Sequence, residues 1–307
     1  MKLSAVVPSF RRPASLLRCL DGMASQIRPL DEVLVVVRPD DIETQKAVRH
    51  ATLPARPVDV TAPGLLAAMR TGAGAATGDV IAFTDDDAVA RPGWAARLEA
   101  HFADADVGAV GGRDVIPGET DGETDDFGRI TPWGALVGNQ HLAAGPAQIV
   151  DVLKGVNMAF RRSALALPTE LRGQGSQMHS EVAICAWAAS RGWRIVLDPE
   201  LIVDHSPAWR PSGDDQLRRR RDARDASFNL VFGLISMRPE LAGRRAVYGV
   251  LVGDALTPGL ARTAAAAVRR ERDVLRIAPA ALWGQLAALV ALTRGQRQRM
   301  VPVVDPP

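Results

Sequence analysis

The chain contains little cysteine, little lysine and little net charge, and the shortages of cysteine and of net charge each exclude a class of protein. Among its 307 residues there are two cysteines, Cys19 and Cys185, each inside an apolar helical pattern. The sequence therefore predicts neither a disulfide framework nor a cysteine-based metal site, and a reducing cytoplasm fits it best. The formal net charge of +2 is too small to indicate a polyanionic partner.

The sequence shows neither the pattern of a signal peptide nor an internal repeat. The first residues enter an apolar, strand-like run at once, without the charged segment, apolar stretch and small-residue cleavage site of a signal peptide. We find no periodic repeat and no low-complexity segment. We therefore expect a protein that stays in the cytoplasm.

Charge is distributed unevenly along the chain. Acidic residues crowd the segments 85–87 and 119–126, whereas arginines gather at 218–221 and 262–276. The lysines are only Lys2, Lys46 and Lys154, so the base composition of the gene is one explanation of the arginine excess. The opposite charges of the two regions indicate different roles.

Hydrophobic periodicity predicts an α/β fold in the first part of the chain. Continuous apolar runs predict strands at Leu3–Pro8, Glu32–Val37, around Val58, at Val80–Thr84 and at 107–110. Helical spacing predicts helices from Pro13 through Met23, at 42–51 and 65–76, and through Trp94, Leu98 and Phe102. Buried strands that alternate with helices indicate a mostly parallel, Rossmann-like sheet covered on both faces.

The second part of the chain changes character twice. Residues 112–155 are rich in glycine, proline, threonine and acidic residues, which predicts a long functional loop. Regular structure is predicted again for a strand at Asn157–Arg161, a helix at 179–191 and strands at 194–197 and 201–204. After Pro211 the pattern is helical and arginine-rich, so we divide the chain into an α/β domain, 1–212, and a helical extension, 213–307.

One stretch of the extension, residues 277–293, carries no charge and lies between Arg276 and Arg294. It contains Pro279 and Gln285 and is slightly short for a membrane span. Three interpretations stay open: a helix lying on a membrane surface, a packing helix of a soluble fold, and a span. Flanking arginines suit anionic lipid headgroups, whereas a solvated arginine face is the alternative.

Three consecutive carboxylates, Asp85, Asp86 and Asp87, follow the predicted strand Val80–Thr84. In open α/β folds ligands bind at this carboxyl end of the sheet. Adjacent carboxylates raise one another's pKa, so a cation or hydrogen-bond donors must neutralise them. Mg²⁺ or Mn²⁺ shared with substrate phosphates is the simplest solution, and a solvated turn or helix N-cap is the alternative.

Four segments, in this order, resemble the family-2 inverting glycosyltransferases of the GT-A fold. They are residues 6–12 (VVPSFRR), 78–87 (GDVIAFTDDD), 155–162 (GVNMAFRR) and 191–195 (RGWRI). The resemblance covers about residues 3–207 and does not specify a sugar. It implies transfer of a sugar from a nucleoside-diphosphate sugar to a hydroxyl of a saccharide or lipid-linked acceptor, in bacterial polysaccharide, glycolipid or cell-envelope biosynthesis.

The resemblance also implies roles for particular residues. Asp85 would face the nucleotide sugar, Asp87 would ligate Mg²⁺ or Mn²⁺, and Asp86 could share either duty. His205 matches a metal-contacting histidine that follows the last core strand of the family. The other residues expected to contact the nucleotide sugar are Pro8, Ser9, Arg11, Asp40, Asp41 and Arg70.

The chain departs from the family pattern at three positions. Arg38 follows the second strand where an aspartate is usual, and the acids arrive only at Asp40 and Asp41. Arg70 is displaced by one position, with Met69 before it, and could equally be a solvated helix charge. Ser180 replaces an acidic residue, so a catalytically degenerate sugar-nucleotide-binding relative stays an alternative.

Inverting transfer requires a carboxylate that takes the proton from the acceptor hydroxyl. Counting back from Gly192 and Trp193, the family's catalytic aspartate corresponds to Glu181. We predict that Glu181 is the general base and that the metal stabilises the leaving nucleoside diphosphate; capping of a helix is the alternative role. Trp133 and His179 are weaker candidates for contacts with the acceptor.

Two other classes fit the sequence less well. A nucleotidyltransferase should show a glycine-rich, basic loop after its first strand, and Pro8-Ser9-Phe10 is not such a loop. A nucleic-acid-binding protein would leave Asp85–Asp87 unexplained, so we expect no nucleic-acid partner. A protein that binds through its basic tail is a further alternative to catalysis. For the enzyme, the basic tail predicts peripheral attachment to the anionic inner face of the cell membrane, near a lipid-linked acceptor.

Overall fold

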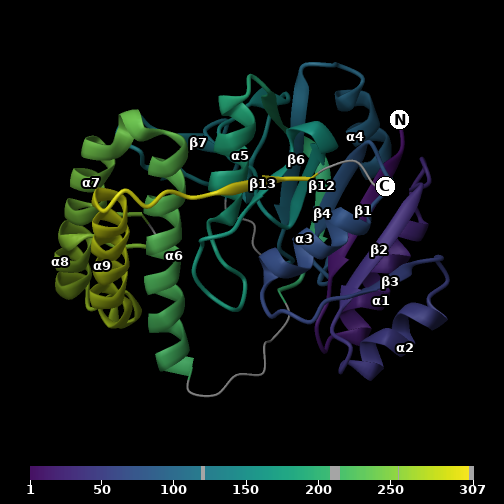
Figure 1. The fold of residues 1–307 in the computed structure, drawn as a ribbon, viewed down its shortest axis with the longest axis horizontal. Coiled ribbons are helices and arrows are strands. Elements are labelled where there is room, and N and C mark those ends of the chain that lie inside the picture. The colour runs from purple at the N-terminus through teal and green to yellow at the C-terminus, as the bar shows by residue number, and fades with distance from the viewer. Residues whose placement is uncertain (119–121, 208–214, 255, 304–307) are drawn as a thin grey trace.

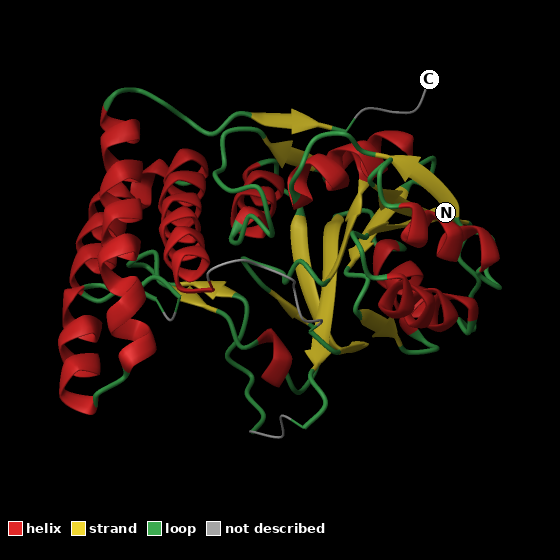
Figure 2. Cartoon of the chain, turned by 90° about the horizontal axis from the view of Figure 1, so that it is seen from below, coloured by secondary structure: helices red, strands yellow, loops and turns green. Residues whose placement is uncertain are grey.

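The computed structural model describes residues 1–118, 122–207, 215–254 and 256–303, and for residues 215–218 only the backbone. Within these ranges a central sheet lies between helices, and a group of long helices stands beside it (Figures 1 and 2). The predicted boundary at residues 212–213 lies outside the described residues, as do residues 119–121 of the acidic run.

The first four long strands form the parallel half of the sheet. They are β1 (Leu3–Pro8), β2 (Glu32–Val37), β3 (Arg56–Asp59) and β4 (Val80–Thr84), in the spatial order β3-β2-β1-β4. Alternate residues enter two different cores: Val6 packs with Met69 of α3 (Leu65–Ala75), whereas Val7 packs with Leu20 of α1 (Pro13–Ala24). Burial on both faces explains why β1, β2 and β4 are almost continuously apolar, whereas the edge strand β3 is mostly exposed.

The second half makes the sheet mixed. β10 (Asn157–Arg161) is inserted antiparallel between β4 and β6 (Val107–Val115). β12 (Arg194–His205) runs parallel to β6, and β5 (Ala88–Ala90) and β9 (Gln148–Ile149) pair antiparallel with β12. The helices α2 (Ile42–His50), α4 (Trp94–Phe102) and α5 (Ser180–Ser190) complete the layers of this domain. The mostly parallel sheet covered by helices is thus confirmed.

Two predictions about strands and loops were wrong in detail. The segments 194–197 and 201–204 are one strand, β12, whose register shifts between Asp198 and Ile202, where Pro199 cannot donate to the ladder. Residues 112–155 are not a single loop. They begin with the end of β6 and contain the hairpin of β7 (Arg129–Ile130) and β8 (Leu136–Val137), a 3₁₀ turn (Gln140–Leu142) and β9.

The C-terminal region is helical, as predicted, but it ends in a strand. Its helices are α6 (Asp215–Met237), α7 (Ala242–Leu251), α8 (Leu260–Arg269) and α9 (Arg272–Thr293), with a 3₁₀ turn at Pro239–Leu241. Phe228 and Phe232 of α6 and Leu292 of α9 belong to the same core cluster as Val6 of β1. β13 (Met300–Pro302) then returns, yellow in Figure 1, to pair antiparallel with β11 (Ala166–Pro168), which follows a 3₁₀ turn at Arg162–Ala164. The extension and the sheet therefore share one core.

Helix α9 contains the uncharged stretch and continues through Pro279. One face carries small buried residues, and at Gly284 an added Cβ would overlap the carbonyl oxygen of Arg224 in α6. The other face exposes Trp283 (65%), Leu286 and Val290. Among the described helices α9 alone is long and apolar enough to cross a membrane. One face is thus a packing surface, and contact of the other with a membrane stays a prediction.

Candidate functional site

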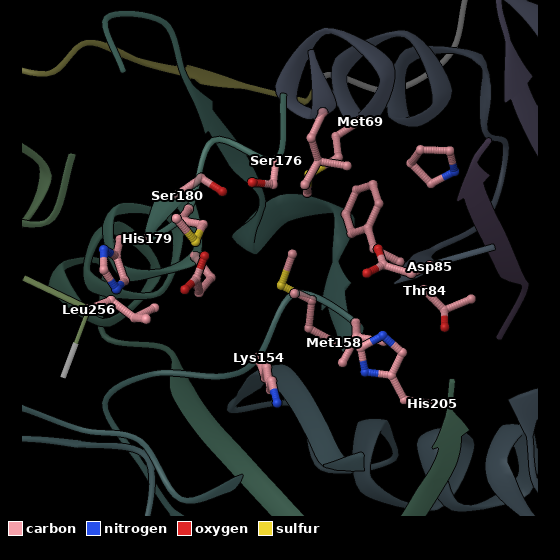
Figure 3. Close-up of a pocket in the computed structure, with 17 residues that line it drawn as sticks. Met69, Thr84, Asp85, Lys154, Met158, Ser176, His179, Ser180, His205 and Leu256 are labelled. Atoms are coloured by element: carbon pink, nitrogen blue, oxygen red, sulfur yellow. The ribbon is translucent and has the colours of Figure 1, made fainter. Parts of the chain in front are cut away.

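A cavity of about 220 Å³ opens at the carboxyl ends of the central strands, and we call it the central pocket. Figure 3 shows Thr84, Asp85 and His205 on one side, which we call the strand wall. His179, Ser180 and Leu256 lie on the opposite side. With Met178 and Glu181, which also line the cavity, they form the helix wall.

Two carboxylates and an imidazole gather at the strand wall. Ligand atoms of Asp85, Asp87 and His205 all lie within 4.8 Å of one another. The sheet explains this meeting, because β5 directly follows Asp87 and pairs with the end of β12, so that His205 stands opposite Ala88. Such a set of oxygen and nitrogen donors can hold a divalent cation.

A buried ionic network holds the histidine of this cluster in place. The carboxylate of Asp114, fully buried in β6, accepts a hydrogen bond of 2.5 Å from Lys154 Nζ and lies 3.4 Å from His205 Nδ1. Nε2 of the same ring lies 3.4 Å from Oδ1 of Asp87. The ring therefore bridges Asp114 and Asp87, an arrangement typical of histidines that bind metals.

The same network sets the protonation of its members. Burial alone lowers the pKa of His205, but the hydrogen bonds and charges of Asp114 and Asp87 outweigh burial and raise this pKa to about 9. Burial raises the pKa of Asp114, yet His205 and Lys154 outweigh it, and the net pKa is lowered. A cation that binds His205 must therefore displace a proton near neutral pH.

Asp86 is not part of the cluster with Asp85 and His205, although it shares Arg12 with Asp87. Its buried carboxylate accepts hydrogen bonds from Ser9 Oγ at 2.7 Å and from Arg12 Nη1 at 2.8 Å. Arg12 also binds Asp87, at 2.8 Å. Burial raises the pKa of Asp86 to about 6, against the opposing effects of Ser9 and Arg12. Asp86 and Ser9 thus tie β1 to the end of β4 and do not line the central pocket.

The predicted nucleoside residues lie at the ends of β1 and β2, but they are engaged in different ways. Pro8 lines the central pocket. Arg11 has a left-handed backbone (φ 56°), and its side chain is largely exposed, 3.9 Å from the equally exposed Asp40. Asp41 is buried. Its carboxylate caps α2 by accepting from Thr44 N, and it also accepts a hydrogen bond from Arg11 N.

Two further predicted residues lie away from the central pocket. Arg70 is exposed on α3 and donates to the carbonyl of Pro168 at 3.0 Å, whereas the preceding Met69 lines the pocket. Trp133 is 53% exposed in the turn between β7 and β8 and is not part of the pocket lining. The structure therefore does not bring Arg70 or Trp133 to the cluster of Asp85, Asp87 and His205.

Glu181 is held on the helix wall in the first turn of α5. Burial raises the pKa of its carboxyl group above the usual range, while the charges of His179 and Lys154 oppose the rise. His179 precedes the helix in a left-handed conformation (φ 67°), and its Nδ1 lies 3.1 Å from the carbonyl oxygen of Ala226 in α6. The extension therefore contacts His179, two residues before Glu181.

The sequence prediction missed several residues of the site, namely Arg12, Asp114, Lys154, Met178 and Leu256. Arg12 stands inside the first family motif, and Lys154 is one of the few lysines and directly precedes the third motif. Their positions in and beside the family motifs were the signals that could have identified Arg12 and Lys154 as site residues. Asp114, Met178 and Leu256 lie in segments where the sequence carries no pattern for their roles.

The sequence of the chain matches a known family and curated relatives. The family described as Glycosyl transferase family 2 matches residues 4–166, more than half of the chain. The pre-mycofactocin glycosyltransferase of Mycobacterium tuberculosis is 30% identical over 149 residues, in strains CDC 1551 / Oshkosh and ATCC 25618 / H37Rv. This match covers 46% of the chain and 30% of the length of the relative.

Solved structures share the fold over most of the chain. The mannosyltransferase PcManGT from Pyrobaculum calidifontis, in complex with GDP-Man and Mn²⁺, has a TM-score of 0.55 at 21% identity, covering 95% of this chain and 86% of its own. S. aureus TarS 1–349, in complex with UDP-GlcNAc, has a TM-score of 0.56 at 11% identity, covering 96% and 93%. At these identities the likeness shows a common fold.

Proposed function

Because the chain belongs to glycosyl transferase family 2 and has the GT-A fold, we propose that it is an inverting, metal-dependent glycosyltransferase. Its donor is a nucleoside-diphosphate sugar and its acceptor carries a hydroxyl group. One observation carries the proposal: Asp85 and His205, whose ligand atoms cluster with that of Asp87, line the same pocket as Glu181. The ligands of the solved relatives, GDP-Man with Mn²⁺ and UDP-GlcNAc, support this donor class.

The strand wall fits a divalent cation. Asp85, Asp87 and His205 would hold it, and buried Asp114 aims the imidazole at this position. When bound, Mg²⁺ or Mn²⁺ supplies Lewis-acid stabilisation of the diphosphate leaving group. Arg12 fixes the carboxylate of Asp87, and Lys154 adds positive charge to the pocket where the diphosphate would lie.

The helix wall supplies the base. Glu181 accepts the proton of the acceptor hydroxyl, and burial makes its carboxylate more basic than an exposed one. Glu181 directly follows Ser180, which lies across the pocket from Asp85 and His205 (Figure 3). The acceptor would therefore attack the anomeric carbon from the side opposite the diphosphate. This geometry favours inversion of the anomeric configuration.

The test is a turnover assay with a panel of GDP- and UDP-sugars. We expect release of nucleoside diphosphate from one donor in the presence of Mn²⁺ or Mg²⁺ and its loss with a chelator. NMR of the transferred sugar should show the anomer opposite to that of the donor. No release from any donor with either metal would contradict the proposal.

We also propose that the acceptor belongs to cell-envelope, glycolipid or polysaccharide synthesis at the inner face of the membrane. The supporting observation is the exposed stripe of Trp283, Leu286 and Val290 on α9, between Arg276 and Arg294. Flotation with anionic vesicles should recover the protein, and Trp283→Ser should weaken recovery. Equal recovery of the variant would argue against this location.

A further inference from the structure

A second cavity, of about 470 Å³, adjoins the central pocket. Met178 and Leu256 line both cavities, and Leu256 belongs to the helix wall (Figure 3). We call the second cavity the arginine groove. Its other lining residues come from two helices, Arg219, Arg220, Asp222 and Ala223 from α6, and Asp273, Arg276 and Ile277 from α9.

The charges of the arginine groove favour an anion. Its lining contains three arginines and two aspartates, so the formal net charge is +1. Arg220 donates through Nε to the carbonyl oxygen of Arg276 at 3.1 Å. Within the described part of the chain this is the single hydrogen bond of the Arg220 side chain, so its two terminal nitrogens can donate to a ligand.

The second arginine of interest forms only a weak ion pair. Nη1 of Arg276 lies 3.4 Å from Oδ1 of Asp273, and the side chains are 49% and 76% exposed. Exposed pairs of this kind contribute little stability because water competes for both partners. A phosphate, which offers more oxygens and more charge than Asp273, can therefore take over the guanidinium.

We propose that the arginine groove is an acceptor subsite that binds a phosphate group of the acceptor through Arg220 and Arg276. The inference rests on the proposed glycosyl transfer and adds the chemical class of the acceptor. Glu181 stands three residues after Met178, so an acceptor anchored in the groove extends past Met178 and Leu256 toward the base. The phosphate can belong to a lipid-linked acceptor or to a soluble one, since both present the same oxygens.

The experiment is calorimetric titration of the full chain with inorganic phosphate, without nucleotide or divalent cation. We expect Arg220→Gln and Arg276→Gln each to weaken phosphate binding about tenfold, the loss of one charge-assisted contact. Arg269→Gln removes an exposed arginine of α8 outside the groove and should change nothing. Asp273→Asn removes the competing carboxylate and should tighten binding, an effect that a damaged fold would not produce.

A parallel titration with dihexanoyl phosphatidic acid, a soluble short-chain lipid, identifies the source. Tighter binding of the lipid than of inorganic phosphate, with the same dependence on Arg220, supports a lipid-linked acceptor that also contacts Ala223 and Ile277. Binding of inorganic phosphate with no gain from the lipid supports a soluble phosphorylated acceptor. Absent binding of both probes, or equal binding by wild type and the Arg220 and Arg276 variants, overturns the proposal. Because no donor or metal is present, this failure is distinct from failure of glycosyl transfer.

Discussion

The two walls of the central pocket are built in different ways. On the strand wall, Asp85, Asp87 and His205 stand at strand ends. Buried Asp114, itself bonded to Lys154, contacts His205, and Arg12 binds Asp87. On the helix wall, Glu181 and its neighbours depend on α6 and α9 packing against the sheet domain. The cluster of Asp85, Asp87 and His205 is thus positioned by the sheet, so we expect changes in the helices of the extension to affect the proposed acceptor side more than the proposed metal and donor side.

The largest expected effect on one wall without an effect on the other is that of Glu181→Gln. Loss of a general base lowers kcat by about 10³-fold. Binding of the metal and the donor should stay unchanged, because the strand wall is intact. Steady-state kinetics and donor titration measure the two effects, with Glu240→Gln, an exposed glutamate, as the control. Wild-type turnover of Glu181→Gln would remove this residue from the mechanism.

The pH dependence of kcat/KM is a second test of Glu181 as the general base. A base must be deprotonated, so kcat/KM should fall as the pH falls through the pKa of Glu181, which burial raises above its ordinary value of 4.5. The residual activity of Glu181→Gln should lack this acidic limb. If the limb persists in the variant, another group is responsible for it.

A smaller effect, confined to the strand wall, is expected for Asp114→Asn. The amide cannot replace the carboxylate that orients the imidazole of His205, and loss of such a partner of a metal-binding histidine weakens metal affinity by about 10–100-fold. Asp198→Asn is the matched control, since Asp198 is also buried and contacts a histidine, His101 Nε2 at 2.9 Å, outside the pocket lining. Equal metal affinity of the two variants, measured with Mn²⁺, would contradict the role given to Asp114.

The smallest expected effect is on the free energy of unfolding, through the packing of α9 against α6. Gly284→Ala forces α9 away from the carbonyl of Arg224, which should destabilise the fold by about 1–3 kcal/mol. Gly243→Ala on α7 meets no atom within 4 Å and should stabilise by about 0.4–1 kcal/mol. Denaturant unfolding measures both changes. We expect metal binding to survive in Gly284→Ala, and its loss would mean that the two walls are not separable.

Much of the fold could be predicted from local patterns in the sequence. β1, β2 and β4 have the bounds that their apolar runs predict, since strands buried on both faces leave an unbroken hydrophobic signal. β13 left no such signal. It is short, and it exists through pairing with β11, more than 130 residues earlier in the chain.

The site likewise has a part that the sequence predicted and a part that it did not. The motif around Asp85 and Asp87 and the position of His205 after the last strand predicted a cluster that the sheet brings together. Asp41 shows the opposite case, because a helix N-cap uses the carboxylate that the family pattern assigned to the nucleotide. The arginine groove depends on the packing of α6 against α9, which periodicity cannot predict.

The central claim is that the strand wall binds a nucleotide sugar through a divalent cation. The most direct measurement is calorimetric titration of GDP- and UDP-sugars onto the wild type and Asp87→Ala, with Mn²⁺ and with a chelator. We expect that one donor binds only when Mn²⁺ is present and that Asp87→Ala weakens this binding at least about 100-fold. Binding that is equally strong with the chelator, or unchanged in Asp87→Ala, would contradict it.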